Sequence, residues 1–488
     1  MGGHSYPQGK PRRFLTEPAR PQFIRDRPNA YWYAVAAVCF GAFMGQLDAS
    51  IVTLAFPTMQ RQFGVTVGAV QWVGLAYLLM LVASLIAVGR YADMVGRKLM
   101  YTFGFVVFII GSALCGFAPD LTLLIVFRVI EAAGAAMLQA NSVAIVAGVM
   151  PKEKLGRGIG VQGAAQALGL ALGPMVGGLL IGLGGWPLIF FVNVPVGIVA
   201  TVMAWYLIPR TRKLAAHTAF DWLGLAIFAP IGVALMLALS LGNQLGWSSP
   251  FVISMWIIAV VGMVLFVRRE SRTAHPMLDL TLMKVKAFWA GVVSGWLIYF
   301  VIFGVLFVVP YYLERTLQFS STRTGLELLA MPLAIGIFSP LSGRFADRLG
   351  AQPLMIFGMS LSVISLLVMA FDHGNLLLLV QLFAVGAGLG MSTAPNNAAT
   401  MGAAPAHSSG VASGVLNMSR GLGTAVGLAL TGVVFAIFAT THPINPVLVA
   451  EGFKYAAIFL AGISFIAVIV SIIRGNGSLA SDPTLLVE

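Results

Sequence analysis

The sequence has 488 residues, of which 59% are hydrophobic and only 9% are charged, and its formal net charge is +12. Soluble domains carry about 25% charged residues. A soluble protein with so few would expose large apolar patches and aggregate. The composition therefore excludes a soluble globular class and predicts an integral membrane protein. Because the positive charges follow the membrane topology given below, we expect no nucleic-acid partner.

Apolar runs of about 17–25 residues recur along the chain, which is the length that a helix needs to cross ~30 Å of hydrocarbon. Fourteen spans are favoured over twelve because the stretch 221–267 holds two runs, separated by the turn-like segment GNQLGWSSP. The first thirty residues are basic and contain no apolar core, so we expect no cleaved signal peptide. The predicted spans are 32–57, 69–91, 100–118, 121–148, 157–183, 188–208, 221–241, 250–267, 287–312, 326–343, 352–371, 375–398, 409–438 and 453–473.

Lysine and arginine residues are unevenly divided between the two sides of these spans. Of the 29, 23 fall on the side of the N-terminus and only four on the other side. Cytoplasmic loops of membrane proteins carry the excess of positive charge. Both termini are therefore predicted to be cytoplasmic.

A repeated segment divides the chain. GRYADMVGRK (89–98) follows the second span and GRFADRLGAQ (343–352) follows the tenth, with Asp93 and Asp347 254 positions apart. At roughly 30 residues per span and loop, this is about eight spans. The spacing predicts two six-helix bundles with two inserted helices between them, a plan suited to a transporter. The predicted parts are a basic tail at 1–30, bundles at 31–208 and 287–473, the inserted pair with linkers at 209–286, and a tail at 474–488.

Two carboxylates lie well inside predicted spans. Asp48 and Glu131 are each about 16 residues from the inner end of a span, so both are ~24 Å deep and could face one cavity. A carboxylate at this depth costs several kcal/mol unless it is paired, hydrated or protonated. Such a group is suited to binding and releasing a proton during transport. The alternative is a neutral acid that only hydrogen-bonds between helices.

Two arginines also lie inside spans. Arg128 precedes Glu131 by three positions, so the two share a helix face. The guanidinium favours the charged form of Glu131 and burial favours the neutral form; the sequence leaves both open. Arg420 is either a tether to the backbone carbonyls of another helix or part of a cavity. The further candidates to line a cavity are Asn417, Trp296 and Tyr299.

The fifth span contains the segment GLALGPMVGG. Glycines four residues apart make a groove that lets a second helix approach closely, and proline kinks a helix because it removes a backbone hydrogen bond. We therefore predict a packing seam or hinge, formed by Gly169, Gly173, Pro174, Gly177 and Gly178.

The loop after the second span places Asp93 at a helix end, with Arg97 four residues later. The carboxylate can cap the N–H groups of a facing helix or pair with Arg97, and such contacts would latch one conformation. The alternative is simply a tight, positively charged turn. The repeat near Asp347 favours a latch, which we assign to Gly89, Asp93, Gly96, Arg97, Gly343 and Asp347.

Motifs of several enzyme classes are missing from the sequence. It contains no GxxxxGK[ST] phosphate-binding loop and no HExxH motif, and its six histidines are scattered over loops and the N-terminal tail. We predict no enzyme activity, no metal site and no bound cofactor. The proton gradient is the expected energy source.

Together these motifs resemble the major facilitator superfamily, and within it the fourteen-span drug:proton antiporter family of bacteria. The resemblance covers nearly the whole chain. The matching segments are QLDASIVTLAFP (46–57), VQWVGLAYLL (70–79), GRYADMVGRK (89–98), RVIEAAGAA (128–136), GLALGPMVGG (169–178), IFFVNVP (189–195), HPMLDL (275–280) and RGLGTAVG (420–427).

This resemblance implies an all-α facilitator fold in the inner membrane of a bacterial cell. Such a protein would export amphipathic compounds in exchange for protons by alternating access. Asp48 would be the proton-coupling carboxylate and Arg128 a partner that tunes it, while the fifth-span motif would shape antiport. Asp93 with Arg97 would help to hold the outward-open state. The sequence departs from the family where Glu131 replaces the usual Gln, which adds a second titratable group. The other departures are Ala132 for Gly, Tyr91 for Leu and Pro187 for Arg.

The leading hypothesis is thus a proton-coupled multidrug exporter. We expect a monomer that handles a small amphipathic substrate and protons within membrane lipid, and a periplasmic adaptor protein stays open as a partner. The alternatives are a dedicated exporter of one metabolite, siderophore or antibiotic, and a facilitator-fold lipid translocator or non-transporting receptor. The formal charge of the cavity is expected to be near zero, because Arg128 and Arg420 offset Asp48 and Glu131.

Overall fold

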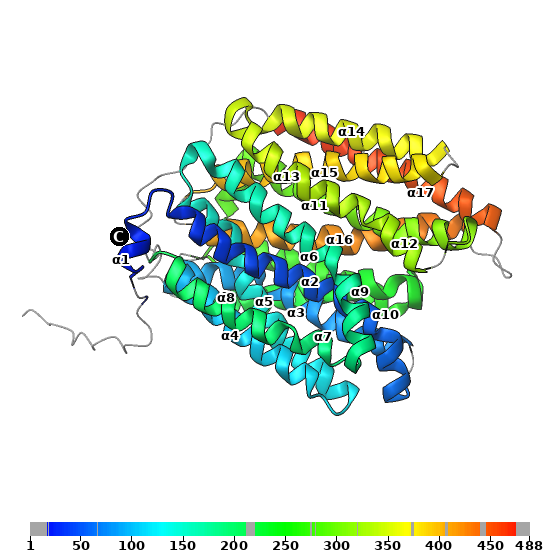
Figure 1. Ribbon diagram of the computed structural model, residues 1–488, viewed down its shortest axis with the longest axis horizontal. Coiled ribbons are helices and arrows are strands. Elements are labelled where there is room, and N and C mark those ends of the chain that lie inside the picture. Colours follow the sequence, from blue (N-terminus) through cyan, green and yellow to red (C-terminus); the bar gives the residue numbers. More distant parts are fainter. Residues whose placement is uncertain are drawn as a thin grey trace, which may run out of the picture.

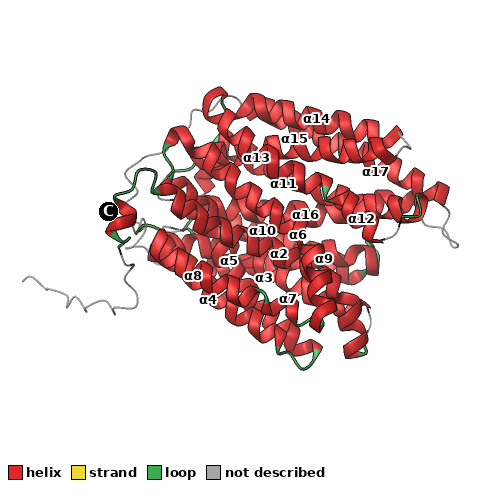
Figure 2. Ribbon diagram, in the orientation of Figure 1, coloured by secondary structure: helices red, strands yellow, loops and turns green. Residues whose placement is uncertain are grey.

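The computed structural model describes residues 17, 19–65, 67–210, 220–273, 276–278, 280–319, 321–371, 375–405, 408–439 and 446–474. Within these ranges every regular element is a helix and no strand occurs (Figure 2). The all-α class expected from the composition is confirmed.

The helices follow one another in two sets of six spans, with a pair between the sets. The first set comprises α2 (Tyr31–Phe63), α3 (Val67–Val95), α4 (Arg97–Gly116), α5 (Leu121–Val149), α6 (Leu155–Gly184), and α7 (Leu188–Phe191) with α8 (Asn193–Leu207). The inserted pair is α9 (Trp222–Leu245) and α10 (Pro250–Glu270). The second set comprises α11 (Lys286–Tyr311), α12 (Ser321–Leu328) with α13 (Ala330–Leu349), α14 (Ala351–Phe371), α15 (Asn375–Gly402), α16 (Ser409–Ala439) and α17 (Pro446–Arg474). Short helical turns lie at Gln22–Arg25 (α1), Lys152–Lys154, Leu280–Lys284 and Tyr312–Thr316.

Thirteen of the described helices are long and apolar enough to cross a membrane, and the count rises to fourteen when the bent helix α6 is taken as one span. This span has two parts, Lys152–Gly173, which includes the helical turn before α6, and Met175–Gly184, and they meet at an angle of 43°. The break lies at the position of Pro174, and a proline that removes a backbone hydrogen bond accounts for it. Several helices run beyond the predicted apolar runs; α17, for example, begins at Pro446 rather than at residue 453.

The two bundles lie side by side. In Figure 1 the first bundle, from blue to cyan-green, occupies the lower part of the view, and the second bundle, from yellow-green to red, occupies the upper part. They meet mainly where α6 packs on α13 and where α16 packs on α3 and α5. The inserted helix α9 contacts both α3 and α16 and therefore touches both bundles.

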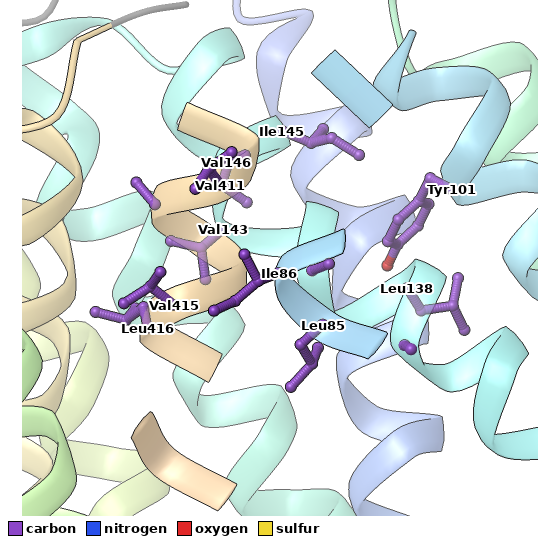
Figure 3. Packing of buried hydrophobic residues seen from close by; sticks show 14 of the residues in the cluster. Leu85, Ile86, Tyr101, Leu138, Val143, Ile145, Val146, Val411, Val415 and Leu416 are labelled. Atoms are coloured by element: carbon purple, nitrogen blue, oxygen red, sulfur yellow. The ribbon is translucent and has the colours of Figure 1, made fainter. Parts of the chain in front are cut away.

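One buried apolar cluster crosses from the first bundle to the second. Val411, Val415 and Leu416 of α16 lie in it beside side chains of α3 and α5 (Figure 3), and the same cluster continues to α4. Close backbone approach accompanies this packing: a Cβ on Gly89 would lie 2.9 Å from the carbonyl carbon of Gly410. We call the end of the molecule that holds these contacts, Asp93 and Asp347 the latch end. The bundles are tightly joined there.

Candidate functional site

Asp48, Arg128 and Glu131 form a buried ion cluster, which we call the core triad. Arg128 Nη1 donates hydrogen bonds to Asp48 Oδ2 at 2.9 Å and to Glu131 Oε2 at 2.7 Å. The exposed fractions of the three residues are 0%, 1% and 0%. With all groups ionised, the triad carries two negative charges and one positive charge. One proton would neutralise it.

Three helices position the guanidinium of Arg128. Arg128 and Glu131 are three residues apart on α5, and Asp48 comes from α2. On α3, the carbonyl of Val73 accepts from Arg128 Nε at 3.2 Å, and the ring of Tyr77 lies 4.2 Å from the guanidinium carbon. A buried ion pair that loses one partner leaves an uncompensated charge. The arrangement therefore depends on all three members.

Neutral side chains surround the triad. Asn193 Nδ2 donates to Asp48 Oδ1 at 3.4 Å and to Ser112 Oγ at 3.1 Å. Cys115 Sγ donates to Glu131 Oε2 at 3.5 Å, and Glu131 Oε1 is buried without a hydrogen-bond partner among the described residues. Sequence reasoning missed Asn193, Ser112 and Tyr77. A polar Asn inside the apolar segment IFFVNVP was the one signal that pointed to this set.

A central cavity lies between the bundles. It consists of two adjoining spaces of about 470 and 220 Å³ that share Gln46 and Gln166. Helices α2, α5 and α6 of the first bundle and α11, α13 and α15 of the second contribute its walls. None of the described residues that line it is charged. They are Gly41, Ala42, Gln46, Leu138, Gln139, Ser142, Gly163, Gln166, Ala167, Leu170, Tyr299, Ile302, Phe303, Pro332, Ile335, Ser339 and Thr393.

The core triad does not line this cavity, which differs from the expectation that Asp48 and Glu131 face it. Gln46 and Asp48 are two positions apart on α2, a rotation of about 200°, so they point to opposite sides of the helix. Gln46 lines the cavity, and Asp48 is buried inside the first bundle. The described cavity walls carry no net charge, as expected, but for a different reason: the two acids and Arg128 lie together inside the first bundle and do not line the cavity. Helix α2 therefore carries both the cavity residue Gln46 and the triad residue Asp48.

The four other cavity candidates divide. Tyr299 lines the cavity, whereas Trp296, Asn417 and Arg420 are not among the lining residues. Arg420 Nη1 donates to Asn417 Oδ1 at 3.0 Å on the same helix, and its guanidinium carbon lies 5.3 Å from the centre of the Tyr299 ring. Asn417 Nδ2 donates to the carbonyl of Gln139 at 2.9 Å. Asn417 thus joins the bundles, while Arg420 lies behind a cavity aromatic.

The glycines of the fifth-span motif lie against α2. A Cβ on Gly169 would lie 3.2 Å from Gln46 Cβ, and one on Gly173 would lie 2.7 Å from Ser50 Cβ. A Cβ on Gly177 would lie 2.8 Å from Ile51 Cγ1, whereas Gly178 has its nearest neighbour, a Leu54 methyl, at 3.8 Å. Gly169, Gly173 and Gly177 therefore let α6 lie directly on α2, the helix that carries both Gln46 and Asp48. The side chain of Pro174 lies outside the described part.

The carboxylate of Asp93 joins the two bundles at the latch end. It accepts hydrogen bonds from the backbone N–H of Gly410, at 3.1 Å to each oxygen, and of Val411 at 3.3 Å. These N–H groups lie in the first turn of α16, where a helix favours a negative charge. Arg97 donates to Asp93 from Nη2 at 2.8 Å and also bonds Ser409. Gly96 has a φ of 119°, a value that favours glycine.

Asp347 makes the same kind of contact in the reverse direction. It lies at the end of α13 and accepts from the N–H of Gly156 at 2.7 Å and of Arg157 at 3.1 Å, in the first turn of α6. A Cβ on Gly343 would lie 2.7 Å from the carbonyl carbon of Gly156. The repeated sequence thus forms a repeated contact between the bundles.

A second cluster of the same three residue types lies on the inserted helices, and sequence reasoning missed it. We call Asp221, Arg269 and Glu270 the peripheral triad. Arg269 Nη2 donates to Asp221 Oδ1 at 2.6 Å, its Nη1 also bonds Asp221, and Nη1 lies 3.2 Å from Glu270 Oε1. Asp221 Oδ1 also caps α9 by accepting from the N–H of Gly224 at 2.7 Å.

The peripheral triad is tied to the segment HPMLDL. Glu270 Oε2 accepts from the N–H of Leu278 at 2.9 Å, while His275 and Asp279 lie outside the described residues. Burial raises the pKa of the Asp221 carboxyl, but the hydrogen bonds from Arg269 and Gly224 outweigh it and hold that pKa below its usual range. No group of three His, Cys, Asp or Glu side chains able to hold a metal is found in the described ranges.

Comparison with known proteins gives the same architecture and several relatives. The family model described as Major Facilitator Superfamily matches residues 38–222 and 291–483. The Riboflavin transporter RibZ of Clostridioides difficile (strain 630) is 33% identical over 408 residues, which cover 83% of this chain and 88% of that protein. The Multidrug resistance protein Stp of Mycobacterium tuberculosis (strain ATCC 25618 / H37Rv) is 33% identical over 412 residues, covering 83% and 76%.

A solved structure supports the fold. The human organic anion transporter MFSD10 (TETRAN) has a TM-score of 0.67 at 14% identity, covering 91% of this chain and all of that one. The family model covers most of the sequence, and the curated relatives match it along most of their length. This multi-pass membrane protein therefore belongs to the major facilitator superfamily of transporters, as its sequence motifs predicted.

Proposed function

We propose that this protein exports small amphipathic, drug-like compounds across the bacterial plasma membrane in exchange for protons, by alternating access. The observation that carries the proposal is the core triad, in which two buried carboxylates share one guanidinium. Its unbalanced negative charge, fully removed from water, is a site that gains stability by taking up a proton. Asp48, Glu131 and Arg128 act together as the proton-coupling group.

The geometry links this group to the substrate space. Helix α2 presents Asp48 to the triad and Gln46 to the central cavity, only two residues apart. The glycine seam of α6 lies on the same stretch of α2. A change of charge at Asp48 therefore acts on a helix that also forms a cavity wall. This supports coupling between proton uptake and the shape of the substrate site.

The latches support alternating access. Asp93 and Asp347 each bond the first turn of a helix in the opposite bundle, so both act only while the latch end is closed. The excess of Lys and Arg in the loops favours a cytoplasmic latch end, with both termini on that side. In this proposal the described state is closed toward the cytoplasm. The two bundles at 31–208 and 287–473 are the rocking units, since the family model leaves out the inserted pair.

The relatives support export, and they also keep a narrower function open. One is named a multidrug resistance protein and another a riboflavin transporter. A dedicated exporter of one metabolite or antibiotic is the second candidate. It is favoured by the uncharged and compact character of the cavity.

The test compares proton movement with substrate movement. A susceptibility panel in a pump-deficient host identifies a compound against which the wild type protects. The protein is then reconstituted in vesicles, and that compound is added while the release of protons is followed. We expect release with the wild type and none with Asp48→Asn, because the triad then carries no unbalanced charge.

The matched control is Asp120→Asn. Asp120 is exposed at the start of α5 and caps it through the N–H of Leu123, a role that Asn also fills. This variant should release protons like the wild type. Undiminished release by Asp48→Asn would refute the coupling role. Protection against a single compound across the whole panel would favour the dedicated exporter.

A further inference from the structure

Three glutamine amides converge on the central cavity from three helices. Gln46 comes from α2, Gln139 from α5 and Gln166 from α6, and all three line the smaller of its two spaces. The Nε2 atom of Gln139 would lie 3.6 Å from a Cβ on Gly45, which places this amide against α2 next to Gln46. All three side chains are half-buried. The cavity thus holds a cluster of polar groups without formal charge.

The protein leaves most of the hydrogen-bonding capacity of these amides unused. No hydrogen bond of the Gln46 or Gln139 side chain to another described residue occurs, and Gln166 Oε1 receives only a long bond of 3.5 Å from Tyr299. The hydroxyls in the same walls are different, because they already donate to backbone carbonyls. These donors are Ser142, Ser339 and Thr393. The amides are therefore the groups that remain for a ligand.

The surroundings of the cavity disfavour a charged ligand. A cation that leaves water needs a carboxylate partner, and none lines the described walls. The core triad lies on the opposite side of α2, and its acids are bound to Arg128. Behind Tyr299 stands the guanidinium of Arg420, whose described hydrogen bond goes to a neutral Asn417. A cationic ligand would thus meet a positive charge and find no counter-charge.

The shape and remaining walls point to a flat ligand. Tyr299 and Phe303 have ring centres 6.4 Å apart and nearly parallel planes at 24°, and Leu170, Ile302 and Ile335 add apolar walls. A primary amide both donates and accepts, so it matches a carbonyl next to an N–H.

We propose that the central cavity selects uncharged, planar aromatic solutes that carry adjoining carbonyl and N–H groups, as in an imide or lactam. The carbonyl and N–H groups of the solute form hydrogen bonds with the amides of Gln46, Gln139 and Gln166. The aromatic and aliphatic side chains of the cavity pack against its ring. This inference rests on the proposed transport function. It narrows "amphipathic" to a neutral class, and it assigns the three amides as specificity-determining residues.

The test measures binding rather than transport, so that it stands apart from proton coupling. Purified full-length protein in lipid nanodiscs is titrated with three fluorescent probes: lumiflavin, which is planar and neutral with an imide edge, N3-methyl-lumiflavin, in which that N–H is blocked, and ethidium, a planar cation. Lumiflavin should bind at least tenfold tighter than either of the others. Equal binding of lumiflavin and its N3-methyl derivative would overturn the proposal without any mutation.

Variants then locate the selectivity. Gln46→Leu and Gln166→Leu should each weaken lumiflavin binding about tenfold, the upper range for one neutral hydrogen bond. Gln46→Glu should bring ethidium binding up to or above that of lumiflavin. The matched control is Gln60→Leu, fourteen residues further along α2 and outside the cavity walls. It should bind like the wild type, and an equal loss there would overturn the assignment.

The outcomes separate this inference from the proposed function. Selective lumiflavin binding together with a triad that releases no protons would leave the inference standing and refute the coupling. Binding of ethidium as tight as that of lumiflavin, together with proton-coupled export of other compounds, would refute the inference and leave the proposed function standing. Failure of lumiflavin to bind at all would also overturn the inference.

Discussion

The core triad and the peripheral triad contain the same residue types, an Asp, an Arg and a Glu, but in different surroundings. Arg128 is 1% exposed at its side chain, whereas Arg269 is 23% exposed. Arg128 and Glu131 are three residues apart on a mid-membrane helix; Arg269 and Glu270 are adjacent where α10 ends. The two triads thus contain the same residue types but differ in their exposure to water.

The two triads differ even more in the groups that stabilise the charge of the second carboxylate. In the peripheral triad, backbone N–H groups of Gly224 and Leu278 donate to Asp221 and Glu270, and Asp221 lies at the N-terminus of α9. These donors stabilise the extra negative charge. In the core triad, by contrast, the hydrogen bond from Asn193 to Asp48 is 3.4 Å long and the one from Cys115 to Glu131 is 3.5 Å long, and both come from side chains. We infer that the ion pair between Asp221 and Arg269 is a permanent tether, and that the core triad needs a proton.

The largest expected effect comes from Arg128→Met. Removing the guanidinium leaves two buried carboxylates without a counter-charge, which should cost about 3–5 kcal/mol. The measurement is thermal unfolding of the purified protein in nanodiscs, with Arg269→Met as the control from the other triad. An equal loss of stability in Arg128→Met and Arg269→Met would contradict the inferred difference between the two triads.

A triple variant sharpens the same point. Asp48→Asn with Glu131→Gln and Arg128→Met removes every charge of the core triad, so most of the stability lost in Arg128→Met should return, while proton release should not. Replacing a buried ion cluster by neutral groups is often close to neutral in stability. A triple variant as unstable as Arg128→Met would show that shape, not charge, sets the cost.

Glu131→Gln should have the next largest effect. This change leaves Asp48 and Arg128 as a balanced pair, so the triad no longer has an unpaired charge for a proton to neutralise. Because the proton belongs to the coupled pair of acids rather than to one of them, we expect substrate-driven proton release to fall at least about tenfold. The protein should remain folded, and the vesicle assay measures the release. Full release would assign the proton to Asp48 alone.

The sequence predicted the charged members of the core triad but not their arrangement. Asp48, Arg128 and Glu131 stand out because charges are rare in apolar spans, and depth follows from residue counting. Which side of α2 faces the cavity depends on how the two bundles pack. A transmembrane helix is apolar on most sides, so its sequence does not show which side faces the cavity. The cavity expectation therefore failed for Asp48, while Gln46 was overlooked as an ordinary polar residue.

The peripheral triad was overlooked for a related reason. Its members lie at the ends of helices, where charged residues are common and usually solvated. Only folding brings Asp221 at the start of α9 next to Arg269 at the end of α10. By contrast, the latches were predictable, because a repeated segment such as the one around Asp93 and Asp347 implies a repeated contact, although the facing helix ends were not identified from sequence.

Arg269→Met should have a smaller effect than any change in the core triad. The guanidinium is partly exposed, so water screens the charges that remain, and the backbone donors of Gly224 and Leu278 stay in place. We expect a loss of about 1 kcal/mol in stability and proton release per substrate like that of the wild type. A loss of coupling in this variant would show that the inserted pair takes part in proton transfer.

Asp221→Asn should have the smallest effect, and its dependence on pH tests the assignment of a permanent tether. Asn retains the cap on α9, so the cost should be about 0.5–1 kcal/mol near neutral pH. The pKa of Asp221 lies below its ordinary value of 3.8. The stability that its charge contributes is therefore fully present above that value and is lost as the pH falls through the lower pKa of the folded state. The difference in melting temperature between wild type and variant should shrink as the pH falls through 3.8 and below it. A difference that already disappears near neutral pH would mean that the peripheral triad, like the core triad, exchanges a proton under working conditions.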